Sequence, residues 1–538
     1  MLNRSKGPAV WSPRAQCDRG LYRRAVRSIL ERQARLECVQ GTVAELLVQA
    51  DTCGGVVTVD GRRYDSAATV ITAGTFLRGR IHLGTSTRID AGRAGEAPSV
   101  EMAEALRGLG FEVQRFKTGT PPRIDGRTVD FGALQRQDGD KTPYWFSVYE
   151  WPEHPAQLPC WLTWSGPELK EIIQRHLSES ALYGGEISGR GPRYCPSVED
   201  KIVKFPDAER HQIFLEPEGL DTSEMYVNGL STSLPPAVQL EFLRTVPGLG
   251  AVHMTRPGYA IEYDYFPPHQ LHPTLETRLL PGLFLAGQVN GTTGYEEAAG
   301  QGAVAGLNAA ASALGREPAV LGRDQAFMGV LVDDLVSRGV DEPYRLFTSR
   351  SEYRLLLRQD NALRRLLPIA LEFGLLDEDE RRIAEGRLER EDRILAVSRE
   401  TDVEAGDSEA ILRDAGFAAV EGRMSVAELA RRPGVPLGRL LEAAAVPHDP
   451  AEAEWADIEL KYAGYLHRER TAAERLRGMD AFTLPDLPYA ELRSLSFEAR
   501  QKLAHTRPAT LGQAGRIPGV SPSDLQGLVF ETLKRRKG

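Results

Sequence analysis

One cysteine in this sequence stands among residues that suit nucleophilic chemistry. Cys195 lies in the run GPRYCPSVEDK at positions 191–201, two residues after Arg193 and directly ahead of a mixed acidic and basic segment. A neighbouring cation lowers the pKa of a thiol, and the thiolate is the form that attacks an electrophile. Most lone cysteines are instead buried packing residues, so these residues alone leave a catalytic and a structural interpretation of Cys195 open.

Three further segments combine residue types that bind anions or line cavities. Two stretches rich in glycine, proline and cations, GRAGEAPS at 92–99 and KTGTPPR at 117–123, show neither helical nor strand periodicity. Such loops bind phosphates or carboxylates, or simply turn corners, and both interpretations stay open. The segment RPGYAIEYDYF at 256–266 alternates aromatic and polar residues, which predicts a strand that lines a cavity.

Composition narrows the classes of protein to consider. A chain of 538 residues with 41% hydrophobic content predicts two or three globular domains. The five cysteines are widely spaced and form no CxxC pair, which predicts neither a metal centre nor a disulfide framework. The chain has no long apolar run and no signal-peptide core, so we expect a cytoplasmic protein that does not span a membrane. The net charge of -9 argues against indiscriminate nucleic-acid binding and leaves room for local basic patches.

The stretch 281–311 predicts a strand, a glycine-rich loop and a helix in succession. The apolar run Leu283 to Ala286 ends at a glycine, and Glu296 and Glu297 lie in the first turn of the expected helix, where carboxylates suit the helix dipole. Small residues recur along one face of this helix, at 298, 299, 302, 303, 306, 309 and 310. This geometry receives an anionic cofactor, or the helix simply packs closely with no ligand; both interpretations stay open.

The first 120 residues read as α/β structure. We expect an amphipathic helix over Leu21 to Arg35, a hairpin at Asp60-Gly61, and a strand from Thr69 to Ala73. Flavoproteins with two dinucleotide domains share this order, as do many other α/β folds. No GxGxxG turn follows a strand here and no P-loop is present; the near match at Gly300 lies inside the expected helix.

The chain becomes helical and charged after about residue 318. Arg350, Arg354 and Arg358 recur every four residues, which predicts one helix face that binds a phosphate backbone, or else a solvated face paired with nearby acids. Lys461 and Tyr462, in the run KYAGY, are expected to begin another helix. At the C-terminus, Ser521 is expected to cap a helix that could bind RNA or another protein.

Several blocks of the chain together resemble the MnmG family, also called GidA, the FAD-containing subunit of a tRNA wobble-uridine modification enzyme. The resemblance runs from LNRSKGPAV at the start to LGQAGRIPGVSPSDL near the end. Its strongest blocks are GPRYCPSVEDK, EPEGLDTSEMYVNGLSTSLP, RPGYAIEYDYF, GLFLAGQVNGTTGYEEAAGQG, GVLVDDLVSRGVDEPYRLFTSRSEYRLLLRQDNA and KYAGY.

The resemblance implies an α/β flavoprotein, with a Rossmann-like FAD/NAD domain, an inserted α+β region and an all-α C-terminal domain. Members of the family carry a first strand, a glycine-rich turn and a further cysteine motif ahead of the LNxSKGPAV segment. We therefore expect the Rossmann-like domain to be N-terminally incomplete here, through truncation or as a shortened variant. The expected divisions are 1–125 and 256–318 for the FAD domain, 126–255 for the NAD-binding insert, 319–470 for the tRNA-binding helices, and 471–538 for partner docking.

The resemblance also implies site residues. Flavin contacts fall on Val43, Ser99 and Gln288, and Cys195 is the cysteine expected to add to C6 of the uridine. The implied NAD-binding stretch runs from Gly189 to Val203 and contains Gly189, Gly191, Pro192, Arg193, Tyr194, Pro196, Ser197, Val198, Glu199, Asp200, Lys201, Ile202 and Val203. The implied tRNA contacts are Arg350, Arg354, Arg358, Lys461 and Tyr462.

The implied reaction uses NADH to reduce FAD and a folate one-carbon unit to place a methylene on C5 of the wobble uridine, with glycine or ammonia completing the side chain. The implied partners are tRNA and the GTPase MnmE, which binds a homodimer to form a heterotetramer. Two alternatives stay open: a non-catalytic tRNA- or partner-binding remnant without the glycine turn, and the related folate- and FAD-dependent tRNA uridine methyltransferase, TrmFO.

Overall fold

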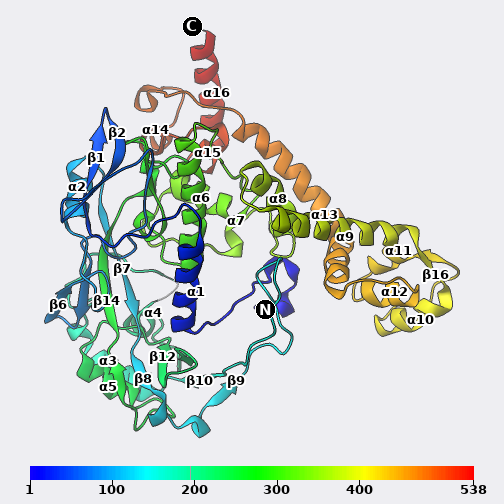
Figure 1. Cartoon of the computed structure of the whole chain (residues 1–538), viewed down its shortest axis with the longest axis horizontal. Coiled ribbons are helices and arrows are strands. Elements are labelled where there is room, and N and C mark those ends of the chain that lie inside the picture. The colour runs from blue at the N-terminus through cyan, green and yellow to red at the C-terminus, as the bar shows by residue number, and fades with distance from the viewer. Residues whose placement is uncertain (194–195, 538) are drawn as a thin grey trace.

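The computed structural model describes residues 1–193 and 196–537 of the chain. Figure 1 shows an α/β body that holds most of the strands, and a helical arm, from α8 (Ala362–Glu372) through α13 (Pro450–Asp480), that extends from it to one side. The predicted combination of an α/β body and a helical C-terminal region is confirmed. Within the described residues, no helix has the length and apolar character needed to cross a bilayer.

Two short parallel strands lie in the core of the α/β body. β4 (Thr69–Ile71) pairs with β15 (Leu283–Leu285), although they are far apart in the sequence. Both strands are confirmed, and a glycine with left-handed φ follows each: Gly74 at 57° and Gly287 at 87°. Because the carboxyl ends of parallel strands lie at the same edge of a sheet, the two glycine turns meet there.

Antiparallel sheets surround this pair. The hairpin at Asp60-Gly61 is confirmed and joins two strands of the sheet β1-β2-β3; the other sheets run β6-β5-β14-β7 and β13-β8-β12-β11-β10-β9. The strands are β1 (Val43–Gln49), β2 (Thr52–Thr58), β3 (Arg63–Asp65), β5 (Arg80–Leu83), β6 (Thr87–Asp90), β7 (Gln114–Thr120), β8 (Arg123–Asp125), β9 (Gln135–Gln137), β10 (Cys160–Trp164), β11 (Gln212–Pro217), β12 (Glu224–Asn228), β13 (Met254–Arg256) and β14 (Tyr259–Tyr265).

Two segments differ from their sequence predictions. The stretch 117–123, predicted as a loop, lies mostly in strands, because β7 extends to Thr120 and β8 begins at Arg123. β14, predicted to line a cavity with alternate residues, is instead an inner strand, and all its residues after Tyr259 are buried. Its acidic residues are compatible with burial because Arg115 of β7 and Arg78, in the turn before β5, bind them.

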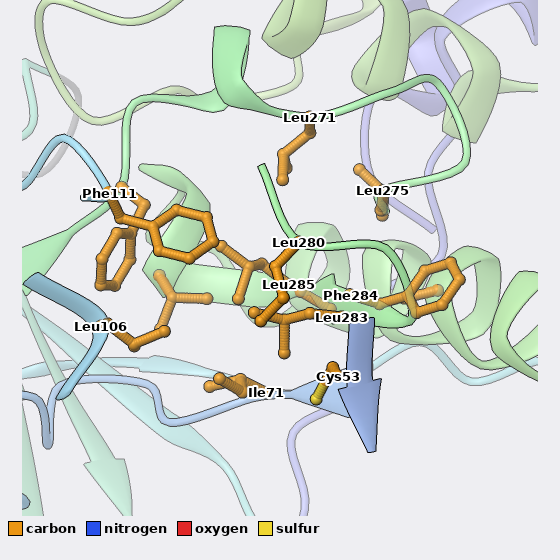
Figure 2. Packing of buried hydrophobic residues seen from close by; sticks show 14 of the residues in the cluster. Cys53, Ile71, Leu106, Phe111, Leu271, Leu275, Leu280, Leu283, Phe284 and Leu285 are labelled. Atoms are coloured by element: carbon orange, nitrogen blue, oxygen red, sulfur yellow. The ribbon is translucent and has the colours of Figure 1, made fainter. Parts of the chain in front are cut away.

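The largest hydrophobic cluster packs around β15. Leu283, Phe284 and Leu285 are completely buried, and Figure 2 shows them among side chains from several separate segments, including Ile71 of β4 and Cys53 of β2. A continuous apolar run is typical of a strand buried on both faces. Cys53 is a packing cysteine, since it is 1% exposed within this cluster.

The small-residue helix predicted after β15 is confirmed as α6 (Tyr295–Ala313). One side packs on α7 (Phe327–Arg338): a Cβ at Gly300 would lie 3.2 Å from Met328 Cγ. A Cβ at Gly302 or Gly306 would meet no atom within 4 Å. The described residues therefore cover only part of the small-residue face.

The remaining helices lie on the α/β body or belong to the helical C-terminal region. The expected helix near residue 21 is present, but its apolar side chains are exposed, since none of its residues is buried. These helices are α1 (Arg19–Arg32), α2 (Glu101–Gly108), α3 (Pro167–Arg175), α4 (Val198–Lys204), α5 (Pro236–Leu243), α9 (Glu378–Glu400), α10 (Ala405–Asp414), α11 (Val426–Ala430), α12 (Leu437–Ala443), α14 (Phe497–Thr506), α15 (Leu511–Arg516) and α16 (Pro522–Lys537). Ser521 Oγ accepts from the Asp524 backbone N–H at 3.2 Å, which confirms the predicted cap of α16.

A buried carboxylate joins the strands of the four-stranded sheet. Asp264 of β14 is completely buried and accepts hydrogen bonds from Arg78 Nε at 2.6 Å and from Arg115 Nη1 at 2.7 Å. Arg115 also donates to Glu262 Oε2 at 3.1 Å. Two arginines therefore share the burial cost of two carboxylates on one strand.

We expect Asp264→Asn to destabilise the α/β body by about 3 kcal/mol, because it leaves two partly buried guanidiniums without their shared anion. Urea unfolding followed by tryptophan fluorescence measures the change. Asp65→Asn is the matched control: Asp65 pairs with Arg63 on an exposed strand, and its loss should cost less than about 1 kcal/mol. Equal effects of the two substitutions would contradict this assignment.

Candidate functional site

The loop between β15 and α6 is organised by one buried side chain. Gln301 accepts from the Gly287 backbone N–H at 3.1 Å and from Asn290 Nδ2 at 2.9 Å, and it donates to Thr292 Oγ1 at 3.0 Å. Gly291, with φ of 83°, completes the turn before the helix. The loop therefore keeps its shape through contacts made inside the protein, and within it only Gln288 and Thr293 keep partial exposure.

The three predicted flavin contacts lie around the β4 edge of this loop. Gln288 is beside Gly74, since a Cβ at Gly74 would lie 3.6 Å from Gln288 Oε1. Ser99 donates its backbone N–H to Phe76 just after that turn, at 2.9 Å. Val43 packs against the core cluster that contains β4 and β15. The structure thus places Gln288 and Ser99 beside the turn that follows β4, and Val43 against the core cluster that contains both strands.

The residues present fit a flat, polar cofactor. Asn290 Oδ1 is buried and has no hydrogen-bond partner among the described residues. The turns at Gly74 and Gly287 carry no side chain, and the α6 N-terminus follows, where backbone N–H groups favour negative charge. A flavin nucleotide offers ring N–H donors and phosphates that match these features.

A second segment covers the loop and is held there by Glu297. The Tyr344 backbone N–H donates to Gly291 O at 2.8 Å, and the Leu346 N–H donates to Glu297 Oε1 at 2.9 Å. Arg345 Nε lies 3.3 Å from the same carboxylate oxygen. Sequence reasoning assigned Glu297 only to the helix dipole; it is instead 3% exposed and binds the segment 344–346.

A third segment, residues 188–193, is fastened to β14 and β7. Glu262 Oε1 accepts from the Ser188 N–H at 3.1 Å and from the Gly189 N–H at 2.8 Å, and Arg190 O accepts from the Lys117 N–H at 3.0 Å. Burial alone would raise the pKa of Glu262, but Arg115 and these donors hold that pKa below its ordinary value. Glu262 is therefore an anion at neutral pH.

The third segment also meets the second. Arg193 Nε lies 3.1 Å from Glu342, and Arg190 Nη1 donates to Asp341 O at 3.1 Å. Below them, Phe116 and Tyr265 stack with ring centroids 3.7 Å apart. Three segments that are remote in the sequence, 188–193, 287–297 and 340–347, thus converge; we call this convergence the junction.

Lys117 is a residue of this region whose role sequence reasoning missed. Its ammonium is buried 3.9 Å from Asp200 Oδ2, and a Cβ on Gly191 would lie 2.3 Å from Lys117 Cε. Burial raises the pKa of Asp200, but Lys204 and Lys117 outweigh this effect and hold it below its ordinary value. The KTGTPPR composition suggested an anion site, while only the fold shows that the lysine faces the 189–203 stretch.

The predicted NAD-binding stretch divides into two parts. Tyr194 and Cys195 lie outside the described residues. After them, Ser197 caps α4, and the buried side chains of Val198, Glu199 and Ile202 face the protein interior. Glu199 Oε1 accepts from Ser180 and Ser233, and Lys201 donates to Gly229 O at 2.8 Å.

The buried part of that stretch corrects the prediction, because side chains used inside the fold are not available to a cofactor. Among the described residues of the stretch, those that keep accessible surface are Arg190, Gly191, Pro192, Arg193, Pro196, Lys201 and Val203. Asp200 is buried, and Gly189 is buried against β7.

The helix face predicted for Arg350, Arg354 and Arg358 is wrong. Thr348–Arg350 is a short 3-10 helix, and no helix follows until α8. Arg358 is 1% exposed and donates to Asp360 and Glu459. Its guanidinium joins the stretch before α8 to α13 and is not accessible to solvent. Arg350 and Arg354 stay accessible.

The run KYAGY also differs from its prediction, since it lies within α13 and does not begin a helix. Lys461 is half-buried and bound to Asp457 and to Val435 O. Tyr462 is likewise half-buried, 6.4 Å from the ring of Tyr465, which is 55% exposed and lies under Arg468.

Comparison with known proteins identifies the family. Residues 1–317 match the family model described as glucose inhibited division protein A. Residues 354–470 and 472–538 match the helical domain and the helical bundle at the C-terminus of the tRNA modifying enzyme MnmG/GidA. The chain belongs to the MnmG/GidA family.

Individual MnmG/GidA relatives agree along nearly the whole chain. It is 47% identical to the tRNA uridine 5-carboxymethylaminomethyl modification enzyme MnmG of Geobacillus thermodenitrificans, over 98% of this chain and 85% of that protein. The enzyme of the same name from Syntrophotalea carbinolica is 48% identical, over 99% and 86%. The structure of Aquifex aeolicus GidA superposes with a TM-score of 0.88 at 46% identity, covering 98% of this chain and 86% of that one.

We expect Gln301→Leu to loosen the cofactor loop, because it leaves the Gly287 N–H without an acceptor in a buried site, at a cost of about 1–3 kcal/mol. Amide hydrogen exchange of residues 285–294 should quicken accordingly. Gln135→Leu on the exposed strand β9 is the control and should leave that exchange unchanged. Unaltered protection of the loop in Gln301→Leu would show that other contacts shape it.

Proposed function

We propose that this chain is the flavin-containing subunit of the enzyme that modifies C5 of the tRNA wobble uridine. The junction supports the proposal most directly, because it brings a cofactor loop, the stretch that leads to Cys195, and the segment that leads to Arg350 and Arg354 into contact. The activity for which the MnmG relatives are named supports the same reaction. The product is a carboxymethylaminomethyl or aminomethyl group on the uracil ring.

The cofactor loop is the proposed FAD site. Bound there, FAD would carry the electrons taken from NADH to the one-carbon unit supplied by a folate. Val43, Ser99 and Gln288 would hold the ring system, while Gln301 keeps the loop in shape from inside. The accessible residues of the 189–203 stretch, with Arg193 among their charged members, would bind NADH beside it.

Cys195 is the proposed nucleophile toward the uracil. C5 of uracil is a poor nucleophile until a group adds at C6, and a thiolate suits that addition. The new C6–S bond pushes electron density onto C5, which then attacks the one-carbon unit; loss of the C5 proton expels the thiolate again. The buried Lys117 ammonium packs on Gly191 in the same stretch.

The helical units are the proposed binding surfaces for macromolecules. Arg350, Arg354 and Tyr462 would contact tRNA, and the C-terminal bundle would dock the GTPase MnmE. We further propose a cytoplasmic homodimer that forms a heterotetramer with that partner. The amine that completes the side chain is glycine or ammonia.

We expect Cys195→Ala to abolish wobble-uridine modification while the protein still binds tRNA. Mass spectrometry of nucleosides from unmodified tRNA, treated with the protein, FAD, NADH, methylene-folate, glycine, MnmE and GTP, measures the product. Cys160→Ala is the matched control, because Cys160 is a partly buried thiol of β10, in the six-stranded sheet, where it contacts Gln16. Full modification by Cys195→Ala would remove Cys195 from the chemistry.

A further inference from the structure

A pocket of about 590 Å³ opens beside the junction, between the C-terminal end of α7 and the short helix Thr348–Arg350. It is lined by Arg338, Phe347, Ser349, Arg350, Ser351 and Glu352. None of the flavin or NAD contacts discussed above lies in its wall. Its volume falls within the range of about 300–1,000 Å³ that is usual for small-ligand sites.

The wall of the pocket contains a guanidinium that no carboxylate of the described residues neutralises. The Arg350 guanidinium lies 4.9 Å from the centre of the Tyr344 ring, and no carboxylate among the described residues lies within ion-pair distance of it. Arg338 is about one-third exposed and has Asp334 at 3.5 Å. The one acid of the wall, Glu352, is bound by Arg323 at 2.9 Å.

The Tyr344 ring also positions Arg350. Tyr344 donates its hydroxyl to buried Asp334 at 2.8 Å, and the Arg350 backbone O accepts from Arg323 at 3.2 Å. The guanidinium is therefore supported from below, while the pocket side of its plane stays open. Two serine hydroxyls beside it, Ser349 and Ser351, are further donors. A fixed guanidinium with neighbouring hydroxyls is suited to the tetrahedral oxygens of a phosphate.

We propose that this pocket binds a backbone phosphate of the RNA next to the nucleotide that enters the junction, an inference that rests on the proposed function. A polymer needs a site that is open along its path. Thr348, Ser349 and Glu352 at the rim are exposed, and the exposed Arg354 follows on the same segment. Tyr344, beneath Arg350, is also the residue whose N–H binds the cofactor loop at Gly291. A phosphate held here would therefore lie next to the flavin loop.

The test is tRNA binding at several salt concentrations by the double variant Arg338→Met, Arg350→Met. We expect the dissociation constant to rise at least tenfold at low salt. The slope of log K against log salt should become shallower by about 0.7 for each phosphate of a single-stranded segment that the variant no longer binds. Arg63→Met, which removes one exposed arginine from β3, is the control for net charge and should change neither quantity.

Two further variants, measured in the same binding experiment, make the result decisive. Should the double variant unfold, the single variant Arg350→Met serves, since its guanidinium makes no ion pair among the described residues. Arg350→Lys should keep most of the salt slope, because it keeps the charge.

Variants that bind tRNA with the affinity and the salt slope of the wild-type protein would overturn the pocket assignment and leave the proposed function standing. A higher KM for NADH with intact tRNA binding would also overturn it and assign the pocket to the dinucleotide phosphates. Wild-type protein that binds no tRNA would instead defeat the proposed function.

Discussion

The candidate site depends on buried carboxylates that accept hydrogen bonds from the backbone of remote segments. Glu262 fastens residues 188–189 to the centre of the four-stranded sheet, and Glu297 fastens residues 345–346 to the first turn of α6. A buried carboxylate is costly unless cations or several donors surround it. Arg115 and Arg345 supply the cations, so each carboxylate holds a loop in one place. Apolar packing alone would leave such glycine- and proline-containing segments free to slide.

This arrangement explains why the site is assembled from segments so distant in the chain. The parallel pair β4 and β15 brings two glycine turns to one edge, while β14 lies in the neighbouring sheet with its acids facing arginines. The segment 340–347 then bridges the two, through Gly291 on one side and Arg190 and Arg193 on the other. A shift of any one segment would break contacts in the other two. The junction is therefore a cooperative unit, in which the position of each segment depends on the other two.

Local signals predicted the elements of the site and not their contacts. The apolar run before Gly287, the Asp60-Gly61 pair and the Ser521 cap each depend on residues a few positions apart, and each is confirmed. Arg358 shows the limit: its four-residue spacing suggested an exposed helix face, but Glu459, about a hundred positions away, binds it inside the fold. The interpretation of Glu297 was incomplete for the same reason. The sequence places its carboxylate in the first turn of a helix, but does not show whether that carboxylate is solvated or accepts a hydrogen bond from a remote backbone N–H. The assignment of Lys117 needed the parallel contact between β7 and residue 190.

The pairing of acids with arginines inside the fold also explains how a chain of net negative charge can have an RNA substrate. Net charge of -9 would repel a polyanion if the charges were spread evenly. Near the junction, however, Asp333, Asp334 and Glu352 share Arg323, and Asp333 also binds Arg516 of the C-terminal bundle. These acids are mostly buried and already neutralised, whereas Arg350 and Arg354 project from the same region toward solvent. At a separation of several ångströms, the local cations dominate the field that a phosphate meets, and salt screens the more distant acids. Local burial of acids, and not the overall charge, therefore decides where a polyanion can approach.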